Sequence, residues 1–192
     1  MKVGFFGGTF NPPHIAHLVA AESVRDRLKL EKILFVPAAM PPHKIKEKIV
    51  PASHRLQMVK LAISGNPSFD CSDIELNREG PSFTIDTIRE LKKSYSDYDL
   101  YLIIGVDLLM DFETWKMPEE ILKECTVVAM NRPGFDLASV EKNLLLRVEL
   151  VNVPGIDISS TSIRRRVKSG RSIRYLVPLQ VEDYIRAKSI YM

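Results

Sequence analysis

The chain has 192 residues, of which 45% are hydrophobic and 27% charged, and its formal net charge is +3. These values fit one compact domain, or one domain with a small appendage, that can bury a real core. The charge is too small to argue by itself for nucleic-acid binding. Neither a secretory leader nor an apolar run of membrane length is evident. We therefore expect a soluble, cytoplasmic protein without a nucleic-acid or membrane partner. Its two cysteines, Cys71 and Cys125, lie far from any CxxC pattern in expected strands, so we expect them to be reduced, buried and inert.

The first elements are a strand, a glycine turn and a helix. Residues 2–6 form a short apolar run, which is typical of a buried strand in a parallel sheet. Gly7-Gly8 should end the strand, and Pro12-Pro13 should fix a rigid approach to the next element. Apolar residues then recur at helical spacing. His14 and His17, three residues apart, are expected in the first helical turn, on one face.

This arrangement favours phosphate binding. Backbone N–H groups and the positive end of the helix would point at the anion, and the two imidazoles would add donors. Plainer interpretations exist for each part, since Gly-Gly after a strand is often only a turn, and the dinucleotide fingerprint Gly-x-Gly-x-x-Gly is absent. A histidine pair can also bind a metal, but no matching group of Cys, Asp or Glu stands nearby.

Strands and helices alternate along the rest of the chain. Further strands are expected at 32–36, 69–74, 99–104, 126–130 and 146–153. Helices are expected from Ser53, as N-cap, to Gly65-Asn66, and at 82–91, 118–123, 160–168 and 178–188, with a short helical piece at 107–112. This order predicts an α/β fold, a doubly wound and mainly parallel sheet with helices on both faces. Ligands bind such sheets beyond the carboxyl ends of the strands, so the loops after the first strand and after strand 99–104 are the expected site.

The run from Gly7 to His17 resembles the signature of the nucleotidyltransferase superfamily, Gly-x-Phe-x-Pro-x-His-x-x-His. It is similar in particular to the bacterial nicotinate-nucleotide adenylyltransferases. One departure is Ala16, where glycine is common in the family; alanine favours the helix and keeps both histidines in register. The resemblance implies a Rossmann-like nucleotidyltransferase fold in a single domain, 1–192, with C-terminal helices at about 159–188 that complete the ATP site.

Four further segments resemble the same family and occur in the expected order. They are Pro41-Pro42-His43-Lys44, the helix start Gly80–Thr87, the run Gly105-Val106-Asp107 through Trp115, and Ile158–Arg164. In addition, Arg132 in Asn131-Arg132-Pro133-Gly134 matches a family arginine that is associated with the mononucleotide. The last of the four places serine and threonine hydroxyls and an arginine at a helix start, which would form a phosphate cradle, whereas simple capping needs only one hydroxyl.

Plainer interpretations also exist for single residues in these segments. Lys44 could contact phosphate or be a solvated loop lysine. The helix start at Thr84 could receive the nicotinate carboxylate, or could simply be capped by Ser82. Trp115 could stack on a pyridinium ring or belong to the core.

The resemblance implies an enzyme of NAD biosynthesis. It would transfer the adenylyl group of ATP to nicotinate mononucleotide and release nicotinate adenine dinucleotide (deamido-NAD) and pyrophosphate. No protein nucleophile is needed, because the acceptor phosphate is already anionic. Magnesium is the expected cofactor, held mainly by the ATP phosphates, so no protein residue is assigned to a metal. The implied catalytic residues are His14, His17, Lys44 and Arg164; the ATP site is Gly7, Gly8, Thr9, Phe10, Gly105, Asp107, Ile158, Ser159, Ser160 and Thr161; the mononucleotide site is Thr84, Trp115 and Arg132.

Several alternatives remain open at this point. Within the superfamily, the acceptor could be nicotinamide mononucleotide or phosphopantetheine, although the segments of Thr84 and Trp115 argue against the latter. A catalytically silent nucleotide sensor would share the fold. A relative of the aminoacyl-tRNA synthetases would also have paired histidines, but the chain is short for one and has no Lys-Met-Ser-Lys-Ser loop. The oligomeric state is open, a homo-oligomer included.

Overall fold

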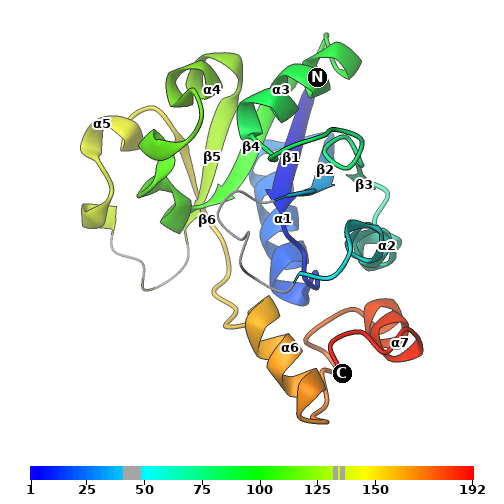
Figure 1. The fold of residues 1–192 in the computed structure, drawn as a ribbon. Coiled ribbons are helices and arrows are strands. Elements are labelled where there is room, and N and C mark those ends of the chain that lie inside the picture. The colour runs from blue at the N-terminus through cyan, green and yellow to red at the C-terminus, as the bar shows by residue number, and fades with distance from the viewer. Residues whose placement is uncertain (41–48, 132–133, 135–136) are drawn as a thin grey trace.

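The computed structural model describes all residues except 41–48, 132–133 and 135–136. Its centre is a six-stranded sheet in the order β3-β2-β1-β4-β5-β6, and each pair of neighbours is parallel (Figure 1). The direction of winding reverses between β1 and β4, where α/β sheets of this order bind ligands. The predicted doubly wound parallel sheet is therefore confirmed. The strands are β1 (Lys2–Gly8), β2 (Lys32–Pro37), β3 (Phe69–Cys71), β4 (Asp99–Gly105), β5 (Thr126–Asn131) and β6 (Glu149–Asn152).

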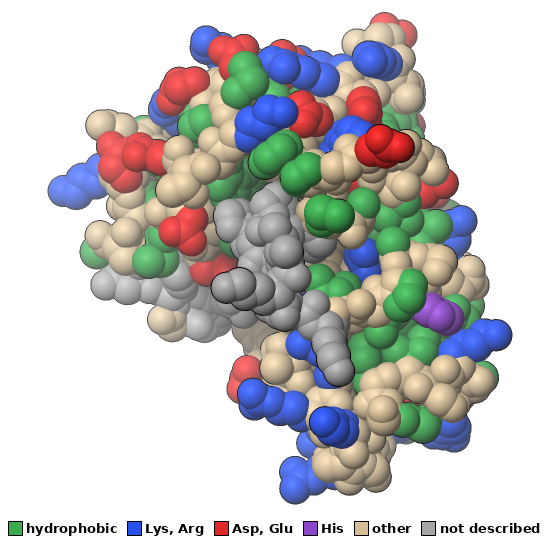
Figure 2. Space-filling view, in the orientation of Figure 1, with side chains coloured by type: hydrophobic (Ala, Val, Ile, Leu, Met, Phe, Trp, Pro, Cys, Tyr) green, Lys and Arg blue, Asp and Glu red, His purple; other side chains and the backbone are tan. Residues whose placement is uncertain are grey.

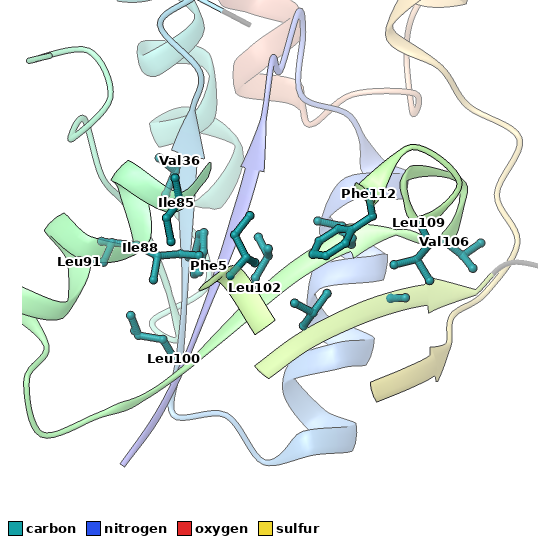
Figure 3. Close-up of a cluster of buried hydrophobic side chains, with 14 of the residues drawn as sticks. Phe5, Val36, Ile85, Ile88, Leu91, Leu100, Leu102, Val106, Leu109 and Phe112 are labelled. Atoms are coloured by element: carbon teal, nitrogen blue, oxygen red, sulfur yellow. The ribbon is translucent and has the colours of Figure 1, made fainter. Parts of the chain in front are cut away.

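Helices cover both faces of the sheet, as the alternation of elements predicted. On one face, α1 (Ile15–Leu28) and α2 (Ala52–Ile63) pack through residues such as Val24 and Val59. The other face is covered by α3 (Thr84–Ser94), α4 (Pro118–Glu124) and α5 (Lys142–Leu145). Side chains alternate along a strand, so neighbouring residues of β1 pack on opposite faces of the sheet. Phe5 joins the core under α3, α4 and α5, and Phe6 joins the core under α1 and α2. Figure 3 shows Phe5 and Leu102 beside the α3 residues Ile85 and Ile88.

The C-terminal helices α6 (Ser160–Lys168) and α7 (Leu179–Ala187) lie beyond the carboxyl end of β1 (Figure 1). They share a third apolar cluster with α2, in which Met58 meets Ile163, Val181 and Ile185. This contact brings the last part of the chain to the edge of the sheet where the site is expected. Lys and Arg side chains gather over this region in Figure 2. Among the described residues, no helix combines the length and apolar character that a membrane crossing requires.

Several element boundaries differ from the predictions. Helix α2 begins at Ala52 after Pro51, so Ser53 lies inside the helix and is not its N-cap. Strand β3 ends at Cys71, because only three of its residues pair with β2. The expected strand 146–153 shortens to β6 because α5 precedes it. The expected helical piece at 107–112 consists of two short 3₁₀ helices, Val106–Leu109 and Phe112–Thr114.

The two cysteines are free thiols, each half-buried. Cys71 ends β3, whereas Cys125 precedes β5 and caps α4, so only the first lies in a strand as expected. Burial raises the pKa of each thiol to about 12. Both are therefore protonated and poorly nucleophilic at neutral pH, in keeping with the predicted inert character.

Candidate active site

The paired histidines lie at the mouth of α1, directly after the central strand β1. His14 is the N-cap and His17 the third residue of the helix, so His14 precedes the helix and does not lie in its first turn. The backbone N–H of His14 donates to Nδ1 of His17 over 3.2 Å. Their rings stack with centroids 3.6 Å apart. The two imidazoles therefore form one rigid pair at the positive end of a helix.

Burial keeps both imidazoles neutral. It lowers the pKa of His14 from 6.5 to about 4, and it lowers the pKa of His17 well below its ordinary value, with a further contribution from His14. Because Nδ1 of His17 accepts a hydrogen bond, the neutral ring carries its proton on Nε2. Nδ1 of His14 is buried and has no hydrogen-bond partner among the described residues. His17 can thus donate through Nε2 without first gaining a proton.

The ring of Phe10 packs against His17 of the histidine pair. Phe10 adopts a left-handed backbone conformation with φ 47° and is buried. Its ring centroid lies 5.3 Å from that of His17 and 5.7 Å from that of Phe6. A Cβ at Gly8 would approach the Phe10 ring to 2.9 Å, which explains the glycine there. The side chain of Phe10 therefore belongs to the core, and only its backbone lies along the candidate ATP site.

Helix α6 meets this loop from the other end of the chain. Arg164 donates from Nη1 to the carbonyl oxygen of Asn11 over 2.9 Å. Ser160 donates from Oγ to the carbonyl oxygen of Pro12 over 2.8 Å. The structure therefore brings together the histidine loop and the guanidinium of Arg164, which the sequence separates by most of its length.

Each hydroxyl of the serine and threonine run has its own partner. Ser159 is the N-cap of α6, and its Oγ accepts the backbone N–H of Ser162 over 3.1 Å. Thr161 accepts from Nη2 of Arg164 over 3.3 Å, and Ile158 packs against the third apolar cluster. The Ser159 hydroxyl thus caps the helix, as the plainer interpretation requires. The Ser160 hydroxyl holds the histidine loop and that of Thr161 holds the arginine, whereas Ser162 donates to the carbonyl oxygen of Ser159 over 2.8 Å. The preceding N–H groups of this turn, those of Ser160 and Thr161, have no partner within the helix and are suited to an anion.

The loop after β4 lies beside the histidine loop at the reversal point of the sheet. Strand β4 is the neighbour of β1 and ends at Gly105. An ideal Cβ at Gly105 would stand 2.6 Å from Oδ1 of Asp107, so the Asp107 carboxylate lies close against the backbone of Gly105. Asp107 is exposed, in a position where it can accept from a hydroxyl.

The candidate mononucleotide residues Thr84 and Trp115 come from neighbouring segments. Thr84 is the first residue of α3. Lys116 binds Asp86 in the first turn of that helix, with Nζ 3.0 Å from Oδ2, and lies 4.7 Å above the Phe83 ring. Trp115 is half-buried and its ring lies 5.2 Å from that of Phe112. One part of the indole therefore packs on the core, as the plainer interpretation expects, and another part reaches the surface.

Ser82 does not cap α3, whose N-cap is Phe83. Its Oγ instead accepts the backbone N–H groups of Ala39 and Met40, over 3.0 and 3.2 Å. The start of α3 is thus tied to the segment that follows β2.

Arg55 is a site residue that the sequence analysis missed. It is 1% exposed and donates to three carbonyl oxygens, those of Thr9 (2.9 Å), Val50 (3.1 Å) and Ala39 (3.3 Å). It thereby joins the loops after β1 and β2. A signal was present, because Arg55 falls on the buried stripe of α2. A charged residue on such a stripe needs buried partners. Tyr191, which donates to Oδ1 of Asn11 over 2.7 Å, gave no such signal.

Lys44 and Arg132 lie outside the described residues, so their places in the site stay predictions. The part of the chain that the structure describes contains no cluster of three or more His, Cys, Asp or Glu side chains suited to a metal ion. The donors around the His14–His17 pair are neutral imidazoles, hydroxyls and a guanidinium. Such a set suits an anion and would receive magnesium only as part of a metal–phosphate complex.

Comparison with known proteins agrees with this geometry. The cytidylyltransferase-like family model matches residues 5–166. A probable nicotinate-nucleotide adenylyltransferase of Thermoanaerobacter sp. is 46% identical, over 100% of this chain and 94% of its own. That of Thermus thermophilus is 44% identical, over 100% of both chains.

The fold is also that of solved nucleotidyltransferases. The Plasmodium falciparum nicotinic acid mononucleotide adenylyltransferase complexed with NaAD superposes with a TM-score of 0.81 at 20% identity, covering 99% of this chain and 97% of that one. The same enzyme complexed with APC gives 0.80 at 20% identity, covering 99% and 96%. The predicted family is therefore confirmed: this chain belongs to the cytidylyltransferase-like nucleotidyltransferases and, within them, to the nicotinate-nucleotide adenylyltransferases.

Proposed function

We propose that the protein transfers the adenylyl group of ATP to nicotinate mononucleotide, forming nicotinate adenine dinucleotide and pyrophosphate in NAD biosynthesis. One observation carries this proposal. Arg164 of α6 contacts the loop that leads into the His14–His17 pair, and this loop lies at the reversal point of the sheet. The names of the full-length relatives support the choice of acceptor. The C-terminal helices, which supply Arg164, complete the ATP site.

The protein accelerates this reaction by positioning and by charge stabilisation. The phosphate of the mononucleotide attacks the α-phosphorus of ATP in line, and the bond to the β-phosphate oxygen breaks. Negative charge develops on the departing pyrophosphate, where His17 donates from Nε2, with His14 beside it. Arg164 and Lys44 would hold the β- and γ-phosphates. Groups already oriented before the reaction lower the barrier because they need no rearrangement at the transition state.

Magnesium is the expected cofactor. It would neutralise charge on the pyrophosphate group, held by phosphate oxygens and water. Thr84 and Trp115 would bind the pyridine end of the acceptor. The N–H groups at the start of α3 suit a carboxylate, the group that separates nicotinate from nicotinamide. Asp107 would accept from a ribose hydroxyl.

The direct test is an assay of pyrophosphate release. Purified protein is incubated with magnesium and ATP, together with nicotinate mononucleotide, nicotinamide mononucleotide or phosphopantetheine. We expect the highest kcat/KM with nicotinate mononucleotide. A higher value with either other acceptor would reassign the substrate, and no release with any of them would favour a nucleotide sensor.

His17→Ala should lower kcat by about 10²-fold or more, the scale for losing one oriented donor to a developing charge. The matched control is His54→Ala, since Nδ1 of His54 lies 2.8 Å from the Tyr184 hydroxyl on α7, in a contact between α2 and α7. This control should keep kcat close to that of the wild type. Steady-state kinetics on both folded variants checks the expectation, and near-normal turnover of His17→Ala would remove this residue from the chemistry.

The buried histidines should also make the protein less stable in acid. Between the ordinary pKa of 6.5 and the lowered pKa of about 4, the unfolded chain binds a proton at His14 that the folded protein does not. The free energy of unfolding therefore falls as the pH falls through this window, by up to about 3 kcal/mol for this one group. Denaturant titrations of wild type and His14→Asn across the window measure the difference. Parallel curves for the two proteins would contradict the assignment.

Trp115→Ala should raise the KM for nicotinate mononucleotide and leave the KM for ATP unchanged. The expected loss is about 0.5–2 kcal/mol of binding, the range for a cation against an indole face. Trp115→Phe keeps an aromatic ring and should lose less. Equal increases of both KM values in the alanine variant would mean that Trp115 serves only the core.

A further inference from the structure

The loop between β1 and α1 is buried although it has no regular secondary structure. Asn11, Pro12 and Pro13 are all buried, and His14 follows them directly. Buried polar groups outside helices and strands need partners from elsewhere in the fold. The side chains that supply these partners therefore decide where the loop lies, and with it the histidine pair.

Within the described part of the chain, three side chains hold this loop at Asn11 and Pro12. Two of them, Ser160 and Arg164, belong to the hydroxyl-rich segment that the family resemblance identifies. The third is Tyr191, whose hydroxyl donates to Oδ1 of Asn11 over 2.7 Å. Tyr191 follows α7 and lies outside residues 5–166, the part that the family model matches. It is the one contact of the three that binds the side chain of the loop and not its backbone.

The backbone at Tyr191 has an uncommon left-handed conformation. Its φ is 68°, in the left-handed region, which a bulky residue rarely adopts. Such a conformation persists only where surrounding contacts hold it. Here Tyr191 packs against the third apolar cluster, which α2, α6 and α7 share. Burial raises the pKa of Tyr191, so its hydroxyl remains a donor at neutral and mildly alkaline pH.

We propose that Tyr191 is a positioning residue of the adenylyl transfer: its hydroxyl fixes Asn11, and through Asn11 the loop that presents His14 and His17 to the polyphosphate. The inference rests on the proposed function of the histidine site. Tyr191 acts through Asn11 and does not contact substrate. A displacement of oriented groups by about 1 Å can lower the rate by about 10²-fold.

The test compares two single-atom deletions, Tyr191→Phe and Tyr184→Phe. Each removes one hydroxyl of the C-terminal region that hydrogen-bonds over a similar distance, 2.7 Å to Asn11 and 2.8 Å to His54. Similar losses of thermal stability are therefore expected. Tyr191→Phe should lower kcat by about tenfold, the cost of displacing oriented groups by part of an ångström, with the KM for nicotinate mononucleotide unchanged. Tyr184→Phe should leave both parameters at the wild-type values.

A double variant tests the route through Asn11. In an Asn11→Ala background, adding Tyr191→Phe should change kcat by less than about twofold, because the shared contact is already gone. Full additivity of the two substitutions would overturn this route.

Equal kcat values for Tyr191→Phe and Tyr184→Phe would overturn the positioning role itself, whether or not the Asn11 variant folds. Calorimetric binding of ATP alone provides a readout without an acceptor, and the affinity should be weaker for Tyr191→Phe than for Tyr184→Phe. A wild type that binds ATP but releases no pyrophosphate would instead contradict the proposed function.

Discussion

The constraint on which the site depends is the need to satisfy the buried polar groups of one short loop. The carbonyl oxygens of Thr9, Asn11 and Pro12 accept hydrogen bonds from Arg55, Arg164 and Ser160. Leaving any one of them unpaired would cost about 1–3 kcal/mol. Because the three donors come from α2 and α6, all three carbonyl oxygens can be hydrogen-bonded only when the loop lies in one place, between these helices. The position of the histidine pair in the fold thus follows from hydrogen bonds made outside the pair.

The sheet determines where that place is. Parallel strands present their carboxyl ends at one edge, and β1 and β4 are neighbours there although far apart in sequence. The histidine loop leaves β1, and the Gly105–Asp107 turn leaves β4. Arg55 then fastens the loop after β1 to the segment after β2, and Ser82 fastens that segment to α3. The ATP side and the mononucleotide side are therefore parts of one connected framework.

The sequence predicted the features that repeat along the chain or stand close together in it. Apolar runs located the strands, their alternation with helices gave the doubly wound sheet, and short signatures located the histidine pair and the segment of Arg164. The errors have local physical causes. Pro51 starts α2, so Ser53 is not its cap, and Ser82 binds a distant segment in preference to its own helix. Arg55 and Tyr191 were missed because a single side chain that bonds a distant loop leaves no periodic pattern, although Arg55 on an apolar stripe was a usable signal.

The histidine loop and helix α6 both line the proposed polyphosphate site but lie far apart in the sequence. This separation affects the order in which the protein folds during synthesis. The histidine loop is synthesised before β2–β6, whereas α6, α7 and Tyr191 are synthesised after all six strands of the sheet. Contacts between such distant segments form late, since the loop that they close is long and entropically costly. A growing chain can thus form its sheet before it can bind a nucleotide. Competence to bind should arise in the final stage of folding, when the last two helices dock.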